Sequence, residues 1–172
     1  AFIAYEQSDE FFQEIGATRN YFVSGQLPYL FAGGDAEKDN FANVNLDARV
    51  NYFGRLSYNY KETYLFQFSL RRDGSLRFSK ESGRWGNFPS ILAGWRISNE
   101  KFWQDNISFI NSFKLKASWG MLGNDRVEPF QYLASYAFSS GGVFGSDRAY
   151  KQSLYQNFTP NPFITWEVSN SY

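Results

Sequence analysis

The side chains that most often carry catalysis and metal binding are scarce in this sequence of 172 residues, which contains no His and no Cys. A Ser-His-Asp triad, a Cys-His pair, a His-ligated zinc and an iron–sulfur cluster each need one of these residue types. Any chemistry would have to use carboxylates, Lys, Tyr or Ser. We therefore predict no catalytic residue, no metal site and no cofactor, which argues against an enzyme.

The overall composition narrows the function further. The 17 basic residues balance the 17 acidic ones, so the chain has no general electrostatic attraction for nucleic acid. Hydrophobic residues make up 43% and aromatic residues 21%, which is too apolar for a disordered chain. No run of about 18 apolar residues occurs, so a transmembrane helix is not expected. The length allows about one domain.

A period of two is the strongest structural signal. Over residues 49–60 the even positions are mostly apolar or aromatic and the odd ones mostly polar, and the pattern resumes over residues 63–73 after Lys61 and Glu62. This arrangement predicts a β-hairpin with a very short connection. The same alternation predicts strands at residues 90–98, 112–121 and 164–169, a strand at 1–6, and a loop hairpin or strand extension at 130–138.

Strand length and connection length distinguish two architectures. Soluble strands usually have about 5 or 6 residues, whereas a tilted strand that crosses a membrane needs about 9 to 11, which is the length predicted for the hairpin arms. The turn at Lys61 is tight, while the predicted connections 7–47, 77–89 and 122–163 lie at the opposite ends of the strands and are mostly longer. Outer-membrane barrels show this asymmetry. A soluble extracellular β-sandwich that binds glycans is the alternative.

Several motifs, taken in order, carry a family resemblance. They include the run Asp73-Gly74-Ser75 and the pair Trp166-Glu167, and they occupy residues 52–60, 72–78, 84–90, 94–102, 114–120 and 161–167. In this order they resemble the barrel of a SusC/RagA-type TonB-dependent outer-membrane transporter. Leu76 and Lys116 depart from the usual pattern of that family without affecting the fold expected.

The resemblance implies an all-β fold: an antiparallel transmembrane β-barrel, of which this chain supplies about six strands, with short periplasmic turns and long extracellular loops. We expect residues 1–172 to be one partial domain of a larger plugged barrel, with the plug, the TonB box and the remaining strands outside the chain. The location implied is the outer membrane of a Gram-negative bacterium, as a multi-pass barrel.

The same resemblance implies a function and partners. The expected function is uptake of glycans or peptides, with the chain serving as part of the barrel wall. The partners implied are a SusD-like surface lipoprotein, the TonB energy-transducing complex, outer-membrane lipid, and an oligosaccharide or peptide substrate. No nucleic acid is expected.

If the apolar faces of the strands meet lipid, the polar faces line a lumen. The charged residues predicted on the lumen side are six basic and two acidic, which would make this wall positive. They are Arg49, Arg55, Arg71, Asp73, Arg96, Lys114, Lys116 and Glu167. Such a wall could simply be polar and hydrogen-bond to the plug, or it could pair with plug carboxylates or guide anionic groups.

Aromatic residues in the predicted long connections are the candidates for ligand or partner contact, because aromatic faces stack on sugar rings. They are equally able to pack the loops themselves. The candidates are Trp85, Phe88, Tyr132, Tyr136, Tyr150 and Tyr155.

Overall fold

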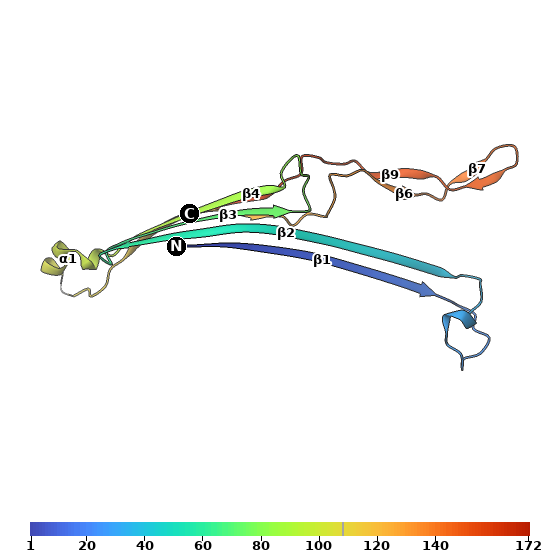
Figure 1. Cartoon of the computed structure of the whole chain (residues 1–172), viewed down its shortest axis with the longest axis horizontal. Helices are drawn as coiled ribbons and strands as arrows, with labels where there is room; N and C mark the ends of the chain where they lie inside the picture. The colour runs from blue at the N-terminus through green and yellow to red at the C-terminus, as the bar shows by residue number, and fades with distance from the viewer. Residues whose placement is uncertain (108) are drawn as a thin grey trace. The chain divides into compact units, whose positions relative to one another are not determined.

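The computed structural model describes residues 1–107 and 109–172, and it is all-β with antiparallel pairing. A six-stranded sheet runs in the order β1-β2-β3-β4-β5-β10 (Figure 1). Its strands are β1 (Phe2–Thr18), β2 (Asp39–Tyr60), β3 (Tyr64–Ser75), β4 (Trp85–Trp95), β5 (Leu115–Asn124) and β10 (Glu167–Ser171).

Two small ribbons and three short helices make up the other regular elements of the described residues. The ribbons pair β6 (Ser135–Phe138) with β9 (Leu154–Phe158), and β7 (Gly142–Phe144) with β8 (Ala149–Lys151). The helices are η1 (Leu30–Ala32), η2 (Ile97–Asn99) and α1 (Lys101–Asn106). No helix of the described residues has the length and apolar character needed to cross a membrane.

The chain separates into two compact units, residues 1–8 with 49–172, and residues 9–48. The second unit contains the later part of β1, η1 and the first part of β2. The connection between β1 and β2 is stabilised by a hydrogen bond of 3.0 Å from Gly34 N to Asn20 O and by an ion pair of 3.8 Å between Arg19 and Asp35.

The predicted hairpin is confirmed in the first unit. Tyr60 pairs with Tyr64, and the ladder continues without a register shift to the pair Arg49–Ser75. Lys61 and Glu62 both have positive φ, 51° and 52°, the backbone conformation that a right-twisted two-strand turn requires. The short connection therefore sets the register of the whole β2–β3 ladder.

Several boundaries differ from the sequence prediction. The loop predicted at 7–47 is wrong over most of its length, because β1 continues to Thr18 and β2 begins at Asp39. Alternation does extend upstream of Arg49, through Val44 and Leu46. The polar positions of this upstream stretch are mostly Asn, a residue that is uncommon in strands. In β1 the adjacent pair Phe11-Phe12 interrupts the alternation, so the sequence signal for both strand extensions is weak.

The loop predicted at 77–89 is also too long, since β4 begins at Trp85. Trp85 and Phe88 are therefore strand residues rather than loop residues. At the other end, residues 97–98 of the predicted fourth strand belong to η2, and β10 begins only at Glu167.

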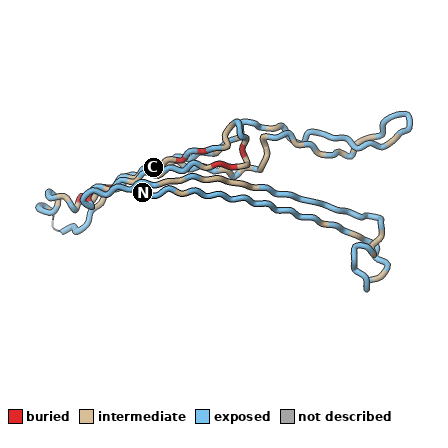
Figure 2. Tube along the Cα trace, in the orientation of Figure 1, coloured by how far each residue is buried: buried red, intermediate tan, exposed pale blue. Residues whose placement is uncertain are grey.

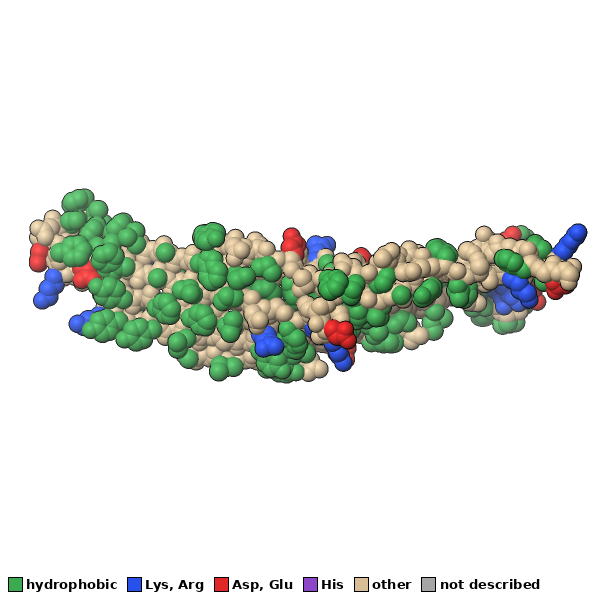
Figure 3. Space-filling view, turned by 90° about the horizontal axis from the view of Figure 1, so that it is seen from above, with side chains coloured by type: hydrophobic (Ala, Val, Ile, Leu, Met, Phe, Trp, Pro, Cys, Tyr) green, Lys and Arg blue, Asp and Glu red, His purple; other side chains and the backbone are tan. Residues whose placement is uncertain are grey.

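Burial is confined to a few places, as Figure 2 shows by the short red segments in a mostly exposed trace. Among the described residues the buried apolar side chains are Phe78, Phe88 and Ile97. The face of the molecule visible in Figure 3 carries hydrophobic side chains in the open, with a stretch of sheet where only hydrophobic and uncharged side chains lie. Large exposed apolar patches of this kind mark surfaces that contact another protein or a membrane.

One aromatic cluster closes the end of the sheet where β3 leads into β4. We call Phe78, Phe88 and Trp166 the rim cluster: the ring of Trp166 lies 5.3 Å from each of the other two. Arg84 ties the cluster together, because its guanidinium donates to Phe78 O at 3.2 and 3.1 Å and its own carbonyl accepts from Trp166 Nε1 at 3.4 Å.

Phe78→Ala should destabilise the protein by about 3–5 kcal/mol, because Phe78 is fully buried and its removal leaves a cavity. The measurement is urea-induced unfolding of the intact protein. Phe144→Ala is the matched control, since Phe144 is 58% exposed and should change stability by no more than about 0.5 kcal/mol. Equal effects of the two substitutions would contradict the role given to the rim cluster.

Candidate functional site

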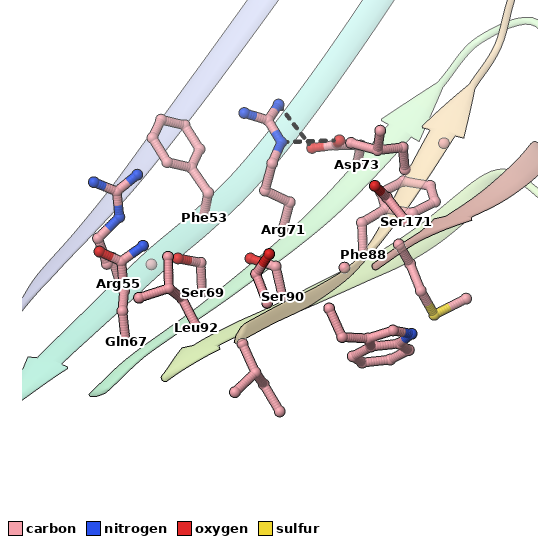
Figure 4. A pocket seen from close by; sticks show the side chains of 18 of the residues that line it. Phe53, Arg55, Gln67, Ser69, Arg71, Asp73, Phe88, Ser90, Leu92 and Ser171 are labelled. Carbon is pink, nitrogen blue, oxygen red and sulfur yellow. Dashed lines mark hydrogen bonds and ion pairs between the residues drawn. The ribbon is translucent and has the colours of Figure 1, made fainter. Parts of the chain in front are cut away.

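One face of the six-stranded sheet gathers most of its charged and polar side chains. Antiparallel register places Phe53, Arg71 and Phe88 in one row and Arg55, Ser69 and Ser90 in the next. We call this the inner face; the alternate residues of the same strands form the outer face. A hollow of about 710 Å³ lies over the inner face, and Figure 4 shows the side chains that line it.

The two central arginines of the inner face are held by rings and by a carboxylate. Arg71 donates from Nε to Asp73 Oδ2 and from Nη2 to Asp73 Oδ1, each at 3.3 Å, in the two-pronged geometry that favours Arg–carboxylate pairs (Figure 4). Its guanidinium also lies 5.2 Å from the centre of the Phe53 ring, and that of Arg55 lies 5.6 Å from the Phe2 ring. These contacts give both cations a defined position.

Two more predicted residues lie where the β2–β3 and β5–β10 ladders end, away from the tight turn. Arg49 pairs with Asp125 at 3.2 Å, and Asp125 comes from the segment just after β5. Glu167 accepts a hydrogen bond of 2.9 Å from Asn124 Nδ2 across the β5–β10 ladder. The sequence-based count of six bases to two acids therefore overstates the positive charge at this end of the inner face.

The remaining three predicted residues gather near the tight turn. Arg96 pairs with Glu62 at 3.6 Å. Lys116 pairs in register with Gly94, and the Lys114 side chain also lies beside Gly94. In the part of the chain that the structure describes, neither lysine forms an ion pair. Partial burial, and then the charges of Lys116 and Arg96, lower the pKa of Lys114.

Several known proteins resemble this chain in sequence or in fold. No family model matches the chain. The TonB-dependent receptor SusC of Bacteroides thetaiotaomicron is 36% identical over 161 residues, which is 90% of this chain and 16% of SusC. The chain belongs to the SusC-like TonB-dependent receptors. The TonB-dependent receptor P39 of Formosa agariphila is 48% identical over 112 residues, or 63% of this chain and 11% of P39.

Solved structures agree with this membership. A structure of the RagAB peptide transporter matches with a TM-score of 0.81 and 25% identity, covering 98% of this chain and 18% of the matched chain. Its 'closed-closed' state, described as a peptide importer, matches with a TM-score of 0.80 and 24% identity, which shows the fold alone. The chain thus spans less than a fifth of these relatives and is a segment of a SusC-like barrel.

The loop candidates divide into two groups in this barrel segment. Tyr136, Tyr150 and Tyr155 lie on the two small ribbons and are 65%, 63% and 51% exposed, while Tyr132 lies 6.3 Å from Phe130 before the first ribbon. Trp85 and Phe88 lie instead in β4: Trp85 beside Tyr52, 6.0 Å away, and Phe88 in the rim cluster.

Two charged residues, Arg72 and Glu100, were not among the site residues predicted from the sequence. Arg72 continues the outer-face series of Phe66, Phe68 and Leu70, so extending the alternation by one step would have found it. Glu100 lies in the connection after β4 and accepts from the Tyr64 hydroxyl at 2.6 Å and from Trp95 Nε1 at 3.1 Å. Its role depends on the fold and has no local sequence signal.

Glu100→Gln should weaken the acid sensitivity of the barrel segment. The hydrogen bonds from Tyr64 and then Trp95 lower the pKa of Glu100. A carboxyl whose pKa is lowered on folding stabilises the protein above its unfolded pKa, and this contribution is lost as pH falls through the folded value. The thermal unfolding midpoint of the intact protein should therefore drop less between neutral and acidic pH in the variant.

Glu81→Gln is the control for this measurement, because Glu81 is exposed and its side chain has no described hydrogen-bond partner. Tyr64→Phe should act in the same direction as Glu100→Gln, since it removes the hydrogen bond with the largest effect on the Glu100 pKa. An unchanged acid response in both Glu100→Gln and Tyr64→Phe would contradict the assignment.

Proposed function

We propose that the intact protein is an outer-membrane importer of a Gram-negative bacterium and that residues 1–172 form part of its barrel wall. The observation that carries the proposal is the two-sided sheet: β2–β4 expose rings and aliphatic side chains on the outer face, while the inner face gathers arginines of β2 and β3 and Lys116 of β5. Likeness to SusC and to the RagAB structures supports the same function. The chain has no proposed catalytic step.

The outer face suits contact with lipid. Tyr58, Phe66, Phe68 and Leu70 are all exposed on adjacent strands, and their backbone groups are paired within the sheet. Burial of such side chains in hydrocarbon is favourable only when every backbone N–H and C=O has a partner. The edge strands β1 and β10 would then pair with other strands of the barrel.

The inner face would meet the plug and the cargo. Arg55, Lys114 and Lys116 carry positive charge without an ion pair among the described residues, whereas Arg49, Arg71 and Arg96 are each neutralised by a carboxylate. We propose that the three unneutralised cations hold plug carboxylates or anionic groups of the cargo. Energy supplied through the TonB complex would remodel the plug and release these contacts.

The double substitution Lys114→Glu with Lys116→Glu should lower uptake at least about tenfold, because it puts like charges opposite the acidic groups that these lysines are proposed to hold. The measurement is uptake of labelled cargo by cells, normalised to the amount of receptor at the surface. Uptake equal to the wild type would reject the proposed role of the inner face.

Lys80→Glu with Lys101→Glu is the matched control, because both lysines are exposed and lie outside the sheet and the ribbons, Lys80 between β3 and β4 and Lys101 at the start of α1. This pair changes the net charge by the same amount and should leave uptake unchanged. A tenfold loss in the control as well would indicate an effect of net charge alone.

The exposed ribbon tyrosines are proposed to contact the SusD-like surface lipoprotein or the glycan or peptide cargo. A two-stranded ribbon is marginally stable alone in water, so open rings on it favour a covering partner. Tyr150→Ala with Tyr155→Ala should weaken the affinity for lipoprotein or cargo about tenfold. The two affinities would be measured by titrating the purified receptor first with the lipoprotein and then with the cargo.

Tyr58→Ala serves as the matched control, since Tyr58 has a similar exposure of 61% but lies on the outer face of the sheet. It should change neither affinity. Unchanged binding of both lipoprotein and cargo in the ribbon variant would exclude these tyrosines from the interface. An intact protein that is monodisperse in water without detergent would favour the soluble β-sandwich instead.

A further inference from the structure

The outer face of β2, β3 and β4 contains one charged residue, Arg72. Register assigns to this face six residues of each strand, and all the others are apolar, aromatic, Gly or Asn. A lone cation on a face that meets lipid is costly at the membrane midplane and inexpensive near the interface. The position of Arg72 along the strand therefore decides what it can do.

Arg72 lies at the far edge of the outer face from the tight turn. It lies eight positions along β3 from Tyr64, whose ring stacks on Trp95 near the turn. At about 3.4 Å per residue and a tilt of about 40°, this distance spans about 20 Å of a hydrocarbon band about 25 Å tall. The long Arg side chain can reach the remaining few ångströms to the headgroups.

Aromatic rings hold the guanidinium at this edge. Its central carbon lies 5.2 Å from the centre of the Trp85 ring. Trp85 in turn lies 6.0 Å from Tyr52, and Tyr52 lies 5.2 Å from Tyr5, so rings from β1, β2 and β4 form a continuous strip. Such a strip is the aromatic girdle that marks a membrane interface in barrels.

Among the described residues, no carboxylate forms an ion pair with Arg72. The strands on both sides of β3 belong to this chain, and the residues paired with Arg72 are Tyr52 and Asn87. The adjacent carboxylate, Asp73, lies on the opposite face and pairs with Arg71. The flat guanidinium is thus covered on its aromatic side while its N–H edges remain available for an anion.

We propose that Arg72, positioned by Trp85 and Tyr52, binds the phosphate of an anionic lipid in the membrane leaflet on the long-loop side. The inference rests on the membrane location given under the proposed function. A guanidinium offers paired N–H groups that match two phosphate oxygens, and stacking on Trp85 reduces the freedom lost on binding. The site would anchor the barrel at a fixed depth.

Arg72→Gln tests the site in the intact protein reconstituted into nanodiscs. The measurement is the ratio of bound anionic phosphatidylglycerol to bound neutral phosphatidylcholine, by native mass spectrometry. We expect the preference for the anionic lipid to fall about fivefold, in line with about 1 kcal/mol per basic residue near a charged surface. Arg72→Lys should retain part of the preference, because it keeps the charge and loses the flat stack.

Arg55→Gln is the matched control: it removes one Arg from the inner face, which faces the lumen under the proposed function. An unchanged lipid preference in Arg72→Gln, or an equal fall in Arg55→Gln, would overturn the site while leaving the barrel assignment intact. Reduced cargo uptake by Arg72→Gln with unchanged lipid preference would assign Arg72 to a protein contact. Failure of the wild-type protein to enter nanodiscs would overturn both proposals.

Discussion

Register in the β2–β3–β4 ladder is the constraint on which the rest of the structure depends. Side chains alternate between faces along each strand, so a slip of β3 by one residue would bring Arg71 and Asp73 to the apolar outer face. The ladder runs for twelve pairs from the turn at Lys61 and Glu62. A short turn in left-handed backbone conformation thereby determines which side of the sheet is charged.

The rim cluster explains why the motifs that carry the family resemblance have the residues they do. Gly86 and Gly123 stand where any Cβ would fall within 2.3 and 2.0 Å of the Phe88 ring. Phe88 therefore needs both glycines, and Trp166 needs Phe88 and Phe78 as its neighbours. Residues far apart in the sequence meet in the one buried aromatic group that the described chain forms.

The sequence predicted what alternation and turn chemistry determine, and it missed what depends on distant partners. Face assignments for Arg55, Arg71 and Asp73 follow from a period of two, which the pairing of β2 and β3 bears out. The neutralisation of Arg49 by Asp125 and of Arg96 by Glu62 could not be foreseen, because both acids lie in connecting segments. The sequence prediction began this strand at residue 90, whereas pairing with Arg71 and packing against Trp166 place Phe88 within β4.

The same rim cluster has a consequence for the order of folding. The hairpin of β2 and β3 joins neighbours in the chain, so its loop-closure cost is small. Trp166 lies 82 residues from Arg84, whose carbonyl accepts its indole hydrogen bond, so this contact closes a much longer loop. Loop-closure entropy therefore favours the local hairpin over the long-range contact that buries Phe78.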